Sequence, residues 1–88
     1  MGFSVTEIQP TPNPNAAKFV LDREITSRPV SFLNAAEGRG DPLASQLFSI
    51  EGVTSVLMLG DFVTVNKAAT TKWDQITEKV IEILQKAP

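Results

Sequence analysis

The sequence predicts a two-layer sandwich of the α+β class, in which a five-stranded mixed sheet carries two helices on one face. Short runs rich in β-branched and aromatic residues alternate with clusters of Gly, Pro and Asn, a pattern typical of strands and turns. Two further segments repeat apolar residues at helical spacing. Two amphipathic helices need one shared apolar surface to cover, which favours the order β-β-β-α-β-β-α with both helices on the same side of the sheet.

The length and the balance of residue types predict one folded domain spanning residues 1–88. A chain of 88 residues is too short to hold two independent cores. Hydrophobic residues make up 42% of the sequence and charged residues 20%, which suits a globule and argues against disorder.

Three strands are predicted in the first half of the chain, at residues 3–9, 17–21 and 30–33. The segment Thr11-Pro12-Asn13-Pro14-Asn15 separates the first two. Prolines cannot donate to a ladder, and Asn side chains bond to nearby backbone, so this segment is predicted to be a rigid turn. Residues 34–40 are predicted to form a loop.

Two helices are predicted from their ends as well as from their periodicity. Asp41 is the expected N-cap of the first, with Pro42 at the first helical position. The helix is expected to end near Ile50, with Gly52 in the left-handed conformation that stops it. Thr71 is the expected N-cap of the second helix. Its buried stripe is expected to contain Trp73, Ile76, Val80, Ile83, Leu84 and Ala87.

A hairpin is predicted from residues 53–59 and 62–67, because Gly60-Asp61 between two apolar runs favours a two-residue loop. Such a loop fixes the pairing. The apolar face that should lie under the helices contains Val56, Met58, Val63 and Val65. The opposite face contains four residues that we predict to bind a partner protein: Leu57, Leu59, Phe62 and Thr64. The alternative is that the loop at residues 10–15 or 34–40 folds over this face.

The turn after the first strand is a second candidate site. Thr11, Asn13, Asn15 and Lys18 would present hydroxyl, amide and ammonium groups to an anion or to a phosphorylated or acidic peptide. A purely structural turn explains the same residues. The hypothesis that follows is a regulatory, peptide-binding domain.

The residue inventory argues against catalysis and against a resident metal or cofactor. The sequence contains no Cys, His or Tyr, so it offers no thiolate, imidazole or phenol as nucleophile, base or soft metal ligand. We predict no catalytic residues, no cofactor and no metal site. Weak iron binding through carboxylates is a third hypothesis, and its candidates are Asp22, Glu24, Asp41 and Asp61.

Charge and hydropathy give the remaining expectations. The eight Lys and Arg residues are scattered, which argues against nucleic-acid binding. No apolar run approaches the roughly 20 residues that a membrane-spanning helix needs, so no membrane partner is expected. We expect a monomer located in the cytoplasm.

The ordered series of motifs resembles the amino-terminal domain of NifU-like (Nfu-type) iron–sulfur cluster scaffold proteins. The matching pieces are Thr11-Pro12-Asn13-Pro14-Asn15, Lys18-Phe19, Asp41-Pro42-Leu43-Ala44, Leu47-Phe48, Ile50-Glu51-Gly52-Val53-Thr54-Ser55-Val56, Asp61-Phe62-Val63-Thr64-Val65 and Trp73-Asp74. The resemblance implies a role in maturing iron–sulfur proteins. Family members join this domain to a carboxy-terminal one that holds the cluster through a Cys-x-x-Cys pair, whereas these 88 residues contain no Cys. What remains implied is an accessory role: contact with assembly factors, with client apoproteins, or with a separately encoded cluster domain.

Overall fold

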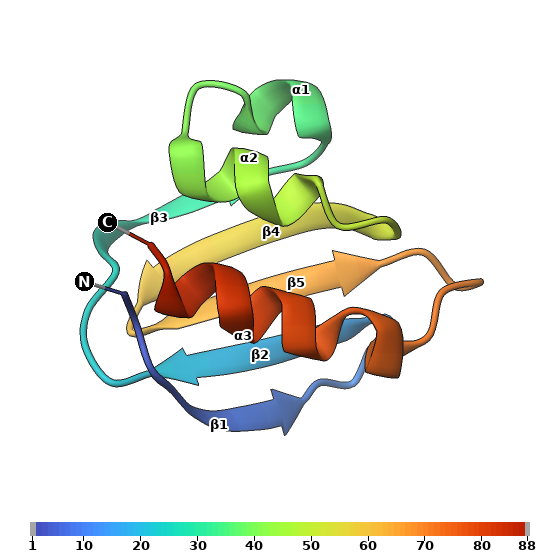
Figure 1. The fold of residues 1–88 in the computed structure, drawn as a ribbon, viewed down its shortest axis with the longest axis horizontal. Coiled ribbons are helices and arrows are strands. Elements are labelled where there is room, and N and C mark those ends of the chain that lie inside the picture. The colour runs from blue at the N-terminus through green and yellow to red at the C-terminus, as the bar shows by residue number, and fades with distance from the viewer. Residues whose placement is uncertain (1, 88) are drawn as a thin grey trace.

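The computed structural model describes residues 2–87. It is an α+β fold, as predicted, and Figure 1 shows α2 and α3 on the same side of the sheet. The strands are β1 (Val5–Pro10), β2 (Ala16–Leu21), β3 (Thr26–Phe32), β4 (Val53–Gly60) and β5 (Phe62–Lys67). The helices are α1 (Ala35–Gly38), α2 (Pro42–Phe48), the short 3₁₀ helix η1 (Trp73–Gln75) and α3 (Thr77–Gln85).

The five strands lie in the order β1-β2-β5-β4-β3, and every neighbouring pair is antiparallel. The predicted mixed sheet is therefore wrong. A parallel neighbour requires a crossover that returns the chain to the same end of the sheet. The connection from β3 to β4 runs from residue 33 to residue 52, and within it α1 and α2 pack on each other. The chain therefore turns back at this end of the sheet, and β4 starts beside the end of β3.

The β4–β5 hairpin has the predicted register. Leu59 pairs with Phe62, Met58 with Val63, Leu57 with Thr64 and Val56 with Val65. The pairing shifts between Val53 and Ser55, where β4 carries a bulge. Gly60 adopts a φ of 57° in the turn, which a residue without Cβ adopts at little cost.

The third strand is longer than expected. It begins at Thr26, so Pro29 lies inside it and not at its entrance. The pairing with β4 is irregular between Thr26 and Val30. Proline is tolerated there because β3 is an edge strand and one side of its backbone needs no partner.

The segment predicted as a loop at residues 34–40 contains helix α1. Asn34 caps it: the Asn34 Oδ1 accepts a hydrogen bond from the Glu37 backbone N at 3.0 Å. The Glu37 Oε1 in turn accepts from the Leu33 backbone N at 2.7 Å. This reciprocal arrangement resembles a capping box, so the spacing of Asn34 and Glu37 was the signal for the missed helix.

The last helical segment also starts differently from the prediction. Residue Lys72, and not Thr71, occupies the N-cap of η1, and α3 begins only at Thr77. Thr71 lies instead against Gly52. The φ of +100° at Gly52 belongs to the turn closed by the hydrogen bond from the Val53 N to the Ile50 carbonyl, because α2 already ends at Phe48 and not near Ile50. The Thr71 side chain therefore packs against Gly52 and does not cap the helix.

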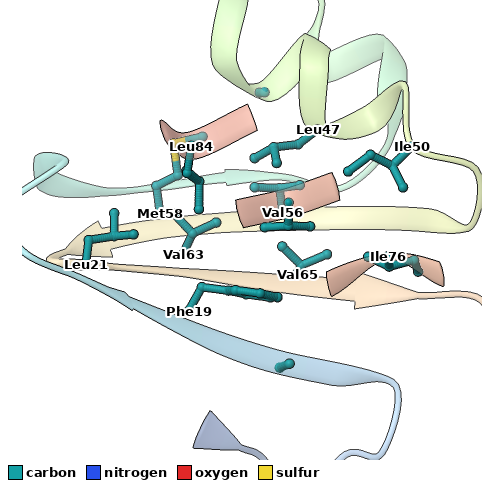
Figure 2. Close-up of a cluster of buried hydrophobic side chains, with 13 residues drawn as sticks. Phe19, Leu21, Leu47, Ile50, Val56, Met58, Val63, Val65, Ile76 and Leu84 are labelled. Carbon is teal, nitrogen blue, oxygen red and sulfur yellow. The ribbon is translucent and has the colours of Figure 1, made fainter. Parts of the chain in front are cut away.

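The core lies between the helices and the sheet face beneath them. Figure 2 shows side chains from both layers converging there. From the predicted stripe of the last helical segment, Ile76, Val80, Leu84 and Ala87 are buried, whereas Trp73 and Ile83 are partly buried. The largest fully buried side chains are Phe19, Leu47, Val56, Val63, Val65, Ile76, Val80 and Leu84. Burial of this apolar surface is the main favourable contribution to folding.

Candidate functional site: the open face of the sheet

The face of the sheet opposite the helices collects all four residues predicted to bind a partner. Side chains alternate across a strand, so the pairing decides which residues share this face. We call the following set the open face: Glu7, Gln9, Lys18, Val20, Ser31, Ser55, Leu57, Leu59, Phe62, Thr64 and Asn66. Its middle is apolar, because Leu57 and Leu59 on β4 lie beside Phe62 on β5, and Phe62 pairs with Val20 on β2.

Neither of the two loops proposed to cover this face does so. In the turn at residues 10–15, the Pro14 carbonyl accepts a hydrogen bond from Trp73 Nε1 at 3.0 Å, on the helix side of the sheet. The segment at 34–40 packs on α2, where Gly38 approaches the Phe48 ring. Within residues 2–87, the partly buried apolar side chains of the open face are not among those packed against the core.

Lys18 belongs to the open face and not to the turn for which it was predicted. It pairs with Thr64, and its ammonium lies 4.1 Å from the centroid of the Phe62 ring. A cation over an aromatic ring at this distance is attracted by the ring quadrupole. By the strand register, Lys18 and Glu7 are the only charged residues of the open face. An aromatic residue among apolar neighbours, with few charged residues around it, is typical of protein–protein contacts.

The other three residues of the second candidate site do come together, but their polar atoms bond to one another and to the backbone. The Thr11 Oγ1 donates to the Asn13 carbonyl at 2.8 Å and accepts from the Asn13 N at 3.1 Å. The Asn13 Oδ1 accepts from the Asn15 N at 2.9 Å. The Asn15 Oδ1 accepts from Lys67 Nζ at 3.0 Å. These bonds make a rigid turn, and they use the hydroxyl proton of Thr11, a donor that was predicted to face a ligand.

Two residues that fix this turn were not recognised from the sequence. Lys67 reaches it from the end of β5, and its ammonium also lies 5.7 Å from the centroid of the Trp73 ring. Trp73 was assigned to the core; its ring centroid does lie 6.5 Å from that of Phe19, but its indole N–H bonds to the turn. The only signal in the sequence was the chemistry of the side chain, since an indole N–H that lies at the edge of a core usually finds an acceptor.

The structure does not assemble the carboxylates proposed for weak iron binding. Asp41 caps α2, where its Oδ1 accepts from the backbone N of Leu43 at 2.9 Å and of Ala44 at 3.0 Å. The Asp22 Oδ1 accepts from the Ser4 N at 3.0 Å. In the described part of the chain, no three residues of the types His, Cys, Asp and Glu are grouped so as to hold a metal ion.

Among residues 2–87, no helix is long and apolar enough to cross a membrane.

Comparison with known proteins identifies the family. The sequence model described as "Scaffold protein Nfu/NifU N terminal" matches residues 5–87. The chain belongs to this family. A NifU-like protein of Schizosaccharomyces pombe is 38% identical over 77 residues, which are 84% of this chain and 30% of that protein. The human mitochondrial NFU1 iron-sulfur cluster scaffold homolog is 45% identical over 66 residues, or 74% of this chain and 26% of that protein.

Solved structures of similar proteins have the same fold as this Nfu/NifU-type chain. The solution structure of a NifU-like protein from Saccharomyces cerevisiae superimposes with a TM-score of 0.82 at 29% identity, covering 97% of this chain and 77% of that one. A crystal structure of a Staphylococcus aureus protein gives a TM-score of 0.77 at 23% identity, covering 91% and 96% respectively, and shows likeness of fold alone. The chain spans less than a third of the length of the curated relatives described above.

Proposed function

We propose that this Nfu/NifU-type domain is a non-catalytic, protein-binding accessory unit in iron–sulfur cluster assembly or delivery. Its partners in this proposal are assembly factors or client apoproteins, and its contact surface is the open face around Leu57, Leu59, Phe62 and Thr64. Membership of the scaffold family and the names of the relatives as iron–sulfur cluster scaffolds support the assembly role.

The open face is the observation that carries the protein-binding part of the proposal. Leu57, Leu59 and Phe62 are partly buried, yet they do not pack against the core. Water in contact with such a surface is released when a partner covers it, and the gain is roughly 25 cal/mol per Å² of apolar area. The charged residues of this face are Glu7 and Lys18, and the Lys18 ammonium lies over the Phe62 ring, so a partner that covers the centre has to offer an acceptor to Lys18.

The residue inventory supports the non-catalytic, accessory part. These 88 residues contain no Cys or His, so they supply neither thiolate nor imidazole to an iron–sulfur cluster. We infer that the cluster ligands come from another domain or another protein, and that this domain contributes recruitment.

The peptide-binding regulatory alternative is less well supported. It requires Lys18 to act together with Thr11, Asn13 and Asn15. The Lys18 ammonium lies over the Phe62 ring on the open face. The Thr11 hydroxyl, a donor that an acidic ligand would need, already donates to the Asn13 carbonyl within the turn.

An affinity capture with quantitative mass spectrometry tests the proposal. The tagged protein is incubated with lysate of its own organism, and iron–sulfur proteins and their assembly factors are quantified. We expect these proteins to be enriched by the wild type and reduced by about tenfold or more with Leu59→Asp or Phe62→Asp, because a single charge buried in an apolar contact costs more than the roughly 1.4 kcal/mol that tenfold represents.

Leu33→Asp is the matched control, since Leu33 is 70% exposed and lies outside the open face. It introduces the same charge and should leave the capture unchanged. The proposal fails if no iron–sulfur protein or assembly factor is enriched, or if all three variants capture the same proteins in the same amounts. Light scattering of the same preparations checks the predicted monomer.

A further inference from the structure

A second surface, separate from the open face, has the features of a peptide-binding site. It is a groove of about 330 Å³ between the β1 edge, the β1–β2 turn and the start of the last helical segment. Ile8, Pro10, Pro14 and Trp73 contribute to its walls, and none of its lining residues is charged. We call it the edge groove. Ile8 is 41% exposed and, with Leu33, is one of the two exposed large hydrophobic side chains among residues 2–87.

The edge groove is held in shape by hydrogen bonds that need no ligand. The Trp73 indole N–H donates to the Pro14 carbonyl at 3.0 Å, which joins one wall to the other. The Thr77 Oγ1 donates to the Trp73 carbonyl at 2.8 Å. The internal bonds of the turn around Asn13 fix the third side. A preformed groove lowers the ordering cost of binding.

The backbone beside the groove is unpaired. β1 is an edge strand, and its partner β2 directs the Leu21 N–H away from it, to the Asp61 carbonyl at 2.7 Å. Hydrogen-bonding direction alternates along an antiparallel strand, so the residues of β2 opposite Glu7 and Gln9 point toward β1. Ile8 lies between these two positions, and its N–H and C=O therefore point to the free edge. The Ile8 side chain lines the edge groove at the same point.

The opposite edge of the sheet, β3, has no comparable free backbone to pair with a peptide. β3 contains Pro29 and an irregular pairing between Thr26 and Val30. Helix α1 follows directly after β3 and contacts it. Proline, bulges and covering elements are the devices that protect an edge strand from pairing.

We propose that β1 and the edge groove bind an extended segment of a partner protein, which adds to the sheet antiparallel to β1. In this pairing an apolar side chain opposite Ile8 enters the uncharged groove, and the next residue of the segment lies opposite Glu7 on the other face. Glu7 is exposed and forms no ion pair within residues 2–87, so a basic side chain complements it there. Addition of a strand to a sheet edge with a side-chain pocket alongside is a recurring mode of peptide recognition.

The bound segment is short. A bulge between Val5 and Glu7 interrupts the ladder on one side of Ile8. Pro10, which has no N–H, ends it on the other. The site therefore selects an apolar residue followed by a basic one within about five residues.

NMR titration of the ¹⁵N-labelled protein with the end-capped pentapeptide Val-Gln-Leu-Lys-Thr tests the proposal. Antiparallel pairing places its Leu opposite Ile8 and its Lys opposite Glu7. We expect saturable shifts of the Ile8 amide and of the Trp73 indole N–H, which reports on the groove wall. Replacing the peptide Leu by Gln should weaken binding by about tenfold or more, because the buried apolar side chain is lost. Replacing Lys by Glu should weaken it by several-fold, and less in high salt.

Protein variants give a second comparison. Ile8→Glu places a charge in the groove and should abolish the shifts. Leu33→Glu introduces the same charge at the other exposed large hydrophobic residue, outside β1 and the edge groove, and should leave binding of the peptide intact. Equal binding of the Leu and Gln peptides, shifts confined to residues around Phe62, or no shift of Ile8 and Trp73 at saturating peptide would overturn the proposal. The peptide comparison needs no altered protein, so it decides the question even if Ile8→Glu does not fold.

Discussion

The two faces of the sheet should respond very differently to removal of a phenylalanine ring. Phe19 on β2 is 0% exposed and contributes to the core, whereas Phe62 on β5 is partly buried on the open face. The change Phe19→Ala should cost about 3–5 kcal/mol of unfolding free energy, through lost burial and the cavity it leaves. The change Phe62→Ala should cost about 1 kcal/mol of unfolding free energy, because it removes a partly buried ring and its cation–π contact with Lys18.

The expected cost at Phe19 is large relative to the whole stability of the domain. At about 0.05–0.15 kcal/mol per residue, a domain of this size is stable by roughly 4–13 kcal/mol. Phe19→Ala should therefore lower Tm by about 12 °C or more, and Phe62→Ala by about 4–8 °C.

Urea unfolding followed by far-UV circular dichroism measures both variants. Circular dichroism is preferable to fluorescence because the Phe19 ring lies close to the Trp73 indole and its loss would change the emission of the folded state. Should Phe19→Ala not fold, Phe19→Leu and Phe62→Leu provide the same comparison on a smaller scale. Costs that agree within about 1 kcal/mol would refute the reasoning, because they would mean that the Phe62 ring is packed as tightly as a core residue.

Three further changes test local features. Gly52→Ala should destabilise the protein by about 1–3 kcal/mol, measured by urea unfolding, because its φ is +100° and an added Cβ would lie 2.6 Å from the Thr71 Oγ1. Asp41→Ala removes the side-chain cap of α2 and should cost about 1 kcal/mol in the same assay. Glu82→Gln should lower stability slightly near neutral pH, because a hydrogen bond from Lys86 and its charge lower the pKa of Glu82. A lowered pKa stabilises the fold above the unfolded-state value, so the difference from wild type should disappear as pH falls through the folded-state pKa.

Each of these changes has a control. Gly40→Ala adds a Cβ that meets nothing within 4 Å, so it should be close to neutral, and an equal loss at both glycines would contradict the backbone argument. Ser45→Ala on the exposed side of α2 keeps the cap, so it should cost less than Asp41→Ala. For Glu82→Gln, a stability difference that persists unchanged in strong acid would show that the Lys86 contact is not its cause.

Local interactions were sufficient to predict much of this fold from the sequence. The register of the β4–β5 hairpin follows from its two-residue turn and from the period of two in side-chain direction. The start of α2 follows from Asp41 and Pro42. Gly52 has the expected positive φ, but it adopts it in the turn before β4, because α2 ends at Phe48. Helix α1 was predictable on the same grounds, since Asn34 and Glu37 carry the signal, although it was missed.

Strand direction and the composition of both surfaces were decided only by tertiary structure. Whether β4 runs antiparallel to β3 depends on how α1 and α2 fold on each other, which no local pattern encodes. Lys18 follows the Thr11–Asn15 turn by three residues, yet its side chain lies on the open face, over Phe62 of the neighbouring strand β5. The edge groove likewise needs Trp73 to meet Pro14 across 59 positions of sequence. Periodicity and capping act over a few residues, whereas these contacts exist only after the layers have packed.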